Sequence, residues 1–88
     1  MFKRVYVVKR DSYKLGFDNA VENYHIELVS SYSTLERAID FIKSLKEMCL
    51  VAGAKIEFES DKYHFLQLYD PEENKRHVYY ISVVDYMG

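Results

Sequence analysis

The C-terminal stretch KRHVYYISVVDYMG, residues 75–88, constrains the fold most because it is apolar on both sides. Successive side chains of a β-strand point to opposite faces, so a strand with one solvated face alternates apolar and polar residues. Here both sets of alternate positions are apolar: Val78, Tyr80, Val84 and Tyr86 form one set, and Tyr79, Ile81 and Val83 form the other. A strand predicted over 76–86 therefore needs cover on two faces.

One amphipathic helix is available to provide that cover. Ser33 to Glu36 read Ser-Thr-Leu-Glu, which fits a capping box in which the Ser33 hydroxyl accepts from the Glu36 amide. Apolar side chains then recur at three- and four-residue spacing with charged residues between them, and this pattern predicts a helix over 34–51. Gly53 fits a left-handed C-cap that ends it.

The remaining segments are typical of strands and turns. Strands are predicted at 3–10, 24–29, 55–59, 63–69 and 76–86, with a short extra strand around 13–17. The first has a continuous apolar centre, which favours an interior position. In the second, Tyr24, Ile26 and Leu28 alternate with His25 and Glu27 and are expected to face the core. Short turns separate the last three strands, so we expect an antiparallel meander, and the order of the other strands is open.

The order β-β-α-β-β-β over residues 1–88 predicts a single α+β domain. Its architecture is one antiparallel sheet of about five strands with the amphipathic helix packed on one face. A helix of this length is about 27 Å long and about 10 Å wide, whereas five strands span about 20–25 Å. One helix therefore covers much of one face and leaves the other open.

Three interpretations of the second face are open. Sheet Val and Tyr side chains tolerate half-exposure, and much of any protein surface is apolar. Alternatively, residues 11–23 fold back as a lid, using Tyr13, Leu15, Phe17 and Val21. In the third interpretation, this face or a strand edge contacts another chain, because Tyr-rich patches mark such surfaces. The simplest version is a homodimer, formed by stacked sheets or by the last strand pairing with its copy.

Composition and charge exclude several classes of protein. The chain is 49% hydrophobic, with nine Tyr and five Phe, which is too apolar and aromatic for a disordered chain. The formal net charge of −2 gives no bulk attraction to nucleic acid or anionic lipid. The single cysteine excludes an internal disulfide and favours a reducing compartment. No apolar run approaches the about 18 residues of a membrane span, and the apolar stretch at the start is too short for a signal peptide. We therefore expect a cytoplasmic protein that does not bind membranes.

No motif for catalysis or ligand binding stands out. His25, His64 and His77 fall on three different predicted strands, so they meet at a metal only if those strands bring them together. Cys49 falls on the apolar stripe of the helix, where a buried inert thiol is expected. The three glycines form no phosphate-binding cluster. We predict no enzyme activity, no cofactor and no metal.

Single-stranded nucleic-acid binding is the alternative function. Five of the 12 Lys and Arg residues lie within residues 1–17, against one acid, Asp11. Some sheet proteins hold single strands by stacking bases on aromatic rings and binding phosphates with such cations. The candidate residues are Lys3, Arg4, Tyr6, Lys9 and Arg10. Against this reading, the rest of the chain is acidic and the signature of the best-known RNA-binding sheet is absent.

The leading prediction is a small non-enzymatic protein-binding module that acts through an aromatic-rich sheet face or edge and self-associates as a homodimer. The candidate contact residues are Tyr63, Phe65, Tyr69, Tyr79, Tyr80 and Tyr86. In size and composition the chain is similar to the small stand-alone α+β proteins common in phages and mobile elements. That similarity implies an inhibitor or regulator of a host protein.

Overall fold

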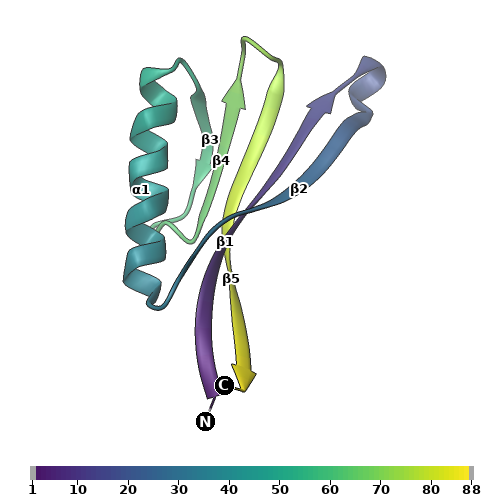
Figure 1. Cartoon of the computed structure of the whole chain (residues 1–88). Coiled ribbons are helices and arrows are strands. Elements are labelled where there is room, and N and C mark those ends of the chain that lie inside the picture. The colour runs from purple at the N-terminus through teal and green to yellow at the C-terminus, as the bar shows by residue number, and fades with distance from the viewer. Residues whose placement is uncertain (1, 88) are drawn as a thin grey trace.

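A computed structural model describes residues 2–87, without the side chains of Phe2, Asn19, Tyr86 and Met87. Its elements follow the predicted order β-β-α-β-β-β (Figure 1). They are β1 (Phe2–Leu15), η1 (Phe17–Asn19), β2 (Val21–Tyr32), α1 (Leu35–Val51), β3 (Lys55–Glu59), β4 (Phe65–Asp70) and β5 (Lys75–Met87). The predicted α+β class, with one antiparallel five-stranded sheet and one helix packed on it, is confirmed.

The strand order β2-β1-β5-β4-β3 places β5 at the centre of the sheet. The last three strands form the predicted meander, and β1 lies between β2 and β5, as its apolar centre indicated. β1 pairs with β5 from Phe2 to Lys14, whereas β4 pairs only with residues 75–80 of β5. Strand β2 and strand β3 are therefore the edges of the sheet, and residues 82–87 of β5 have a second, shorter free edge.

Residues 11–23 do not form a lid, so that interpretation is wrong. Ser12 pairs with His25 and Lys14 with Glu22, and the Gly16 amide donates to the Ala20 carbonyl at 2.7 Å to close the tip. The backbone of this segment is satisfied by pairing within the sheet, so it extends β1 and β2 as a hairpin instead of covering a face. The hairpin projects away from α1 (Figure 1).

The helix begins one residue later than the predicted capping box requires. Thr34 is the N-cap, and its side-chain oxygen accepts from the Arg37 amide at 3.3 Å. Both neighbouring hydroxyl residues can cap a helix, and the extended backbone of Thr34 decides between them. At the other end Gly53 adopts φ 98°, and the Ala54 amide donates to the Cys49 carbonyl at 2.9 Å. This is the left-handed cap predicted for Gly53.

The core lies between α1 and the helix-facing sides of β1, β4 and β5. Its buried members are Val8, Ala38, Ile42, Leu66, Leu68 and Tyr79. Tyr79 and Ile81 face the helix, as one of the two predicted alternatives for β5 required. Val83, two residues further along the same face, is 52% exposed. The C-terminal part of β5 extends beyond the helix (Figure 1). A 17-residue helix is about 25 Å long, whereas the molecule extends 50 Å along its main axis.

The side chains of Tyr24, Ile26 and Leu28 do not face the core, which corrects the prediction for the second strand. They are 55%, 57% and 67% exposed. Alternation shows that a strand has two different faces, but it does not show which face meets the helix. In the structure, His25 and Glu27 occupy the helix side of β2.

Candidate functional site

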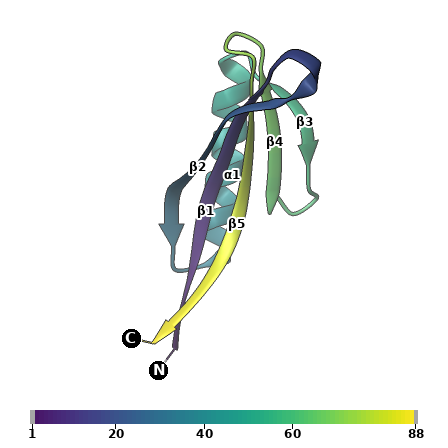
Figure 2. The ribbon, with the colours of Figure 1, turned by 90° about the vertical axis from the view of Figure 1, so that its right-hand side faces the viewer.

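We call the side of the sheet away from α1 the outer face. Figure 2 shows α1 behind the sheet, whereas the tip of the β1–β2 hairpin, with η1, projects on the side that faces the viewer. Opposed residues of an antiparallel pair share a face, so the strand register shows which residues lie on the outer face. Lys9 lies between Leu28 and Tyr80, and Asp11 lies between Ile26 and Val78. Among the residues that the structure describes, α1 does not pack on the outer face, although Val7 on that face is 7% exposed.

The carboxylate of Asp11 connects three strands on the outer face. It accepts hydrogen bonds from the hydroxyls of Tyr24 on β2, at 2.6 Å, and Tyr80 on β5, at 3.1 Å. The Tyr24 ring also stacks on Tyr13, with centroids 6.3 Å apart. The bond to Asp11 is the main cause that raises the pKa of Tyr24, and burial raises the pKa of Tyr80. Both hydroxyls therefore stay protonated donors at neutral pH, and they fix the rings in place.

Three of the six predicted contact residues lie on the outer face. Phe65 packs edge-on against Phe58 of β3, with ring centroids 5.4 Å apart. The hydroxyl of Tyr69 donates to Asn74 at 2.8 Å, and the Arg76 guanidinium lies 4.9 Å from the Tyr69 ring centroid. Phe65 opposes Tyr80 across β4 and β5, and Tyr69 lies further along the same face of β4, beyond Gln67.

The other three predicted contact residues lie elsewhere. Tyr79 is 4% exposed and belongs to the core, so it is not available to a partner. Tyr63 has φ 57° in the turn before β4 and packs on the helix side, where Lys46 donates to its hydroxyl at 3.3 Å. That left-handed backbone takes Tyr63 out of the alternation that placed it with Phe65. The side chain of Tyr86 lies outside the described residues.

The five residues of the nucleic-acid alternative are divided between the two faces. They are Lys3, Arg4, Tyr6, Lys9 and Arg10. All five lie on β1, where odd-numbered side chains point to the outer face and even-numbered side chains point to the helix side. Lys3 and Lys9 therefore lie on the outer face, and the other three lie on the helix side. Arg4 pairs with Asp85 at 2.8 Å and Arg10 pairs with Glu27. No face gathers the basic and aromatic groups that the alternative requires.

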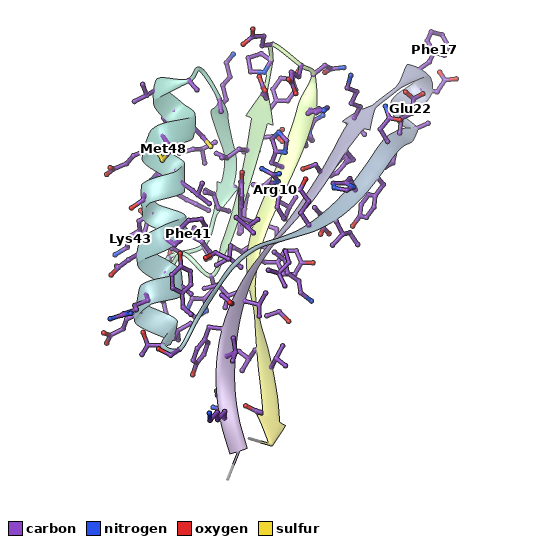
Figure 3. The ribbon with its side chains drawn as sticks, viewed as in Figure 1. Arg10, Phe17, Glu22, Phe41, Lys43 and Met48 are labelled. Atoms are coloured by element: carbon purple, nitrogen blue, oxygen red, sulfur yellow. The ribbon has the colours of Figure 1, made fainter. Side chains whose placement is uncertain are left out.

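The helix side of the sheet carries a polar groove, which the sequence did not indicate. It has a volume of about 530 Å³ and is lined by residues of β1, β2 and β5 and by Glu73 in the turn before β5. Arg10, labelled in Figure 3, is one of the lining residues. The Arg10 side chain binds Glu27 on one side and the Tyr79 hydroxyl on the other, at 3.4 Å. The only pattern in the sequence that pointed to this groove was the polar alternation of Arg10, Ser12 and Lys14. These side chains line a groove only because β2 and β5 flank β1, and that strand order was not predicted.

Two of the three histidines line this groove. Ser12 lies between His25 and His77 in register, and its Oγ is 2.7 Å from His77 Nδ1. Burial, and then the charge of Arg10, lower the pKa of His77, so that ring is neutral at pH 7. His64 lies in the turn before β4, outside the groove. Within residues 2–87, no group of three His, Cys, Asp or Glu side chains is placed to hold a metal ion.

The two edges of the sheet differ in how they are protected. Strand β3 is five residues long and charged, with Glu57 paired to Arg76 at 2.9 Å and Glu59 to Lys46 at 2.7 Å. Short, charged edges resist pairing with another chain. Strand β2 has 12 residues, and none of the turn and loop backbone hydrogen bonds of the described residues involves it. The edge of β2 that does not pair with β1 is therefore free, and the exposed apolar side chains of β2 lie beside it.

No helix in the described part of the chain is long and apolar enough to cross a bilayer. No family model, curated protein or solved structure matches the chain.

Proposed function

We propose that the chain is a small protein-binding module that acts through the outer face and the free edge of β2, and that it self-associates. The observation that carries this proposal is the exposure of Tyr24, Ile26 and Leu28 on an edge strand with no described neighbour. An edge strand offers a partner backbone hydrogen bonds, and apolar side chains beside it add burial.

The order of the outer-face side chains also supports binding. Side chains that are already fixed lose little conformational entropy when a partner docks. Tyr24 and Tyr80 are both held by Asp11, and Phe65 is held against Phe58. Tyrosine is favoured at interfaces because its ring is apolar while its hydroxyl keeps a polar partner.

Such a module acts by occupying a surface and not by chemistry, as an inhibitor or regulator of another protein does. The one thiol fits this proposal. Burial raises the pKa of Cys49, which disfavours the thiolate that nucleophilic catalysis requires. A mobile-element origin and a cytoplasmic location belong to the same proposal.

Sedimentation velocity of the purified chain, from about 5 to about 200 µM, tests the proposal. We expect the average mass to rise above that of the monomer as concentration increases. Leu28→Lys places a charge on the outer face and should shift the equilibrium toward monomer. Met48→Lys is the matched control because Met48, on α1, is 68% exposed and Leu28 is 67% exposed. A wild-type chain that remains monomeric over the whole range would overturn the proposal.

A further inference from the structure

We infer that the partner of the β2 edge is a second copy of this chain, paired antiparallel about a two-fold axis at Ile26. This inference rests on the proposed function and specifies it. The two sheets would join edge to edge into one sheet of ten strands, because each protomer contributes five. The two outer faces would then be continuous across the junction.

The bulges in β2 limit where such pairing can occur. The register between β1 and β2 shifts between Val8 and Lys9, and again between Ser12 and Lys14. Each shift places an extra residue in β2, and bulges interrupt pairing and increase the local twist. Between them, β2 pairs regularly with β1 over residues 25–28. Together with Tyr24, at the start of the second shift, these residues form a short window centred on Ile26. All three of its outer-face side chains are more than half exposed.

The sequence of this window is self-complementary about Ile26. Opposed residues in an antiparallel pair share a face. With the axis on Ile26, that residue opposes its own copy, and Tyr24 of each protomer opposes Leu28 of the other. On the helix side, His25 of each protomer opposes Glu27 of the other. Aromatic–aliphatic pairs stabilise neighbouring strands, and a histidine ring N–H can donate to an opposed carboxylate.

The neighbouring registers lack this match. An axis on His25 opposes the two copies of His25, and an axis on Glu27 opposes two carboxylates. Like charges directly opposite each other destabilise a strand pair. In the single chain, His25 Nε2 lies 3.1 Å from one Glu27 carboxylate oxygen and Arg10 donates to the other, so the carboxylate is held beside the free edge, within reach of a second histidine. Repulsion between the carboxylates therefore disfavours the axis on Glu27, and of the three registers only the axis on Ile26 opposes His25 with Glu27.

Cysteine cross-linking tests the register in solution. In a Cys49→Ala background, Ile26→Cys places two thiols on opposed Cα atoms about 4.5–5.5 Å apart, which is within the range for a disulfide. Val21→Cys is the matched control because Val21 and Ile26 are both 57% exposed on β2. In the inferred register the two copies of residue 21 are separated by about 33 Å.

We expect Ile26→Cys to form disulfide-linked dimers about 100-fold faster than Val21→Cys, since pairing raises the local thiol concentration from micromolar toward millimolar. Ile26→Lys, without cysteines added, should also return the native chain to monomer with an unchanged circular dichroism spectrum. Equal cross-linking rates in a chain that still dimerises would overturn the register and leave the proposed function standing. A dimer that survives Ile26→Lys would place the contact elsewhere, for instance at residues 82–87 of β5. A monomeric wild type would overturn both.

Discussion

Replacing Ile42 by Ala tests whether α1 is the main cover of the core. Ile42 is fully buried, and it packs among Val8, Leu66, Leu68 and Tyr79. The substitution removes three carbon atoms, which corresponds to about 2.4 kcal/mol of transfer free energy at about 0.8 kcal/mol each. The cavity that remains adds to this, so we expect a loss of about 3–4 kcal/mol in the free energy of unfolding.

That loss is large for a chain of 88 residues, for which a total stability of about 4–13 kcal/mol is typical. Urea unfolding followed by circular dichroism measures it, with all variants at one protein concentration because self-association adds apparent stability. Val51→Ala is the control: Val51 lies on the same helix, is 90% exposed and should change stability by less than about 0.5 kcal/mol. A loss below about 1 kcal/mol for Ile42→Ala would refute the reasoning, because the core would then not depend on this contact.

Three further predictions follow from individual contacts. The pKa of His77 is lowered in the folded chain, so protons bind the unfolded state more readily. The free energy of unfolding should therefore fall as pH drops below about 6.5. Urea midpoints measured between neutral and acidic pH should show a smaller pH dependence for His77→Asn than for the native chain. Thr34→Ala should cost about 1 kcal/mol in thermal unfolding and Ser33→Ala much less, whereas a capping box at Ser33 would give the reverse. Asp11→Asn should lower the pKa of Tyr24 toward its ordinary value in a spectrophotometric titration, and an unchanged titration curve would show that the hydrogen bond is not the cause.

Much of the architecture was predictable because it depends on local patterns. The helix follows from its apolar periodicity and from Gly53, which alone among its neighbours adopts a positive φ. The meander of β3, β4 and β5 follows from the short turns between them. The apolar face of the helix follows from the same periodicity, and alternation divides β5 into two sets, of which Tyr79 and Ile81 meet the helix in the structure. These features need no knowledge of strand order.

The β1–β2 hairpin was not predictable in its full length because tertiary partners stabilise it. Residues 10–14 are mostly polar, which argues against a strand by propensity. In the structure Arg10 binds Glu27 and Asp11 binds Tyr24, so the polar side chains contribute to pairing with β2. Such cross-strand pairs depend on a register that the sequence alone did not specify.

The sequence predicted that an apolar sheet surface would lack cover, but it did not predict which residues form that surface. Apolar residues on two faces of β5 and β1 indicated a surface without cover, and the structure shows such a surface. Its residues differ, because Tyr63 and Tyr79 turned inward while Ile26 and Leu28 turned outward. The helix contacts the middle of one face only, and its position decides which alternate set of each strand is buried.

Amide hydrogen exchange across β2 tests the central claim most directly. If the free edge of β2 binds a second copy, the outward-pointing amides of residues 24–28 should become protected as the concentration rises from about 5 to about 200 µM. The amides of β3, the charged edge, should exchange at the same rate throughout and provide the internal reference. Equal exchange of residues 24–28 at both concentrations, in a sample that still self-associates, would contradict the claim that β2 is the contact edge.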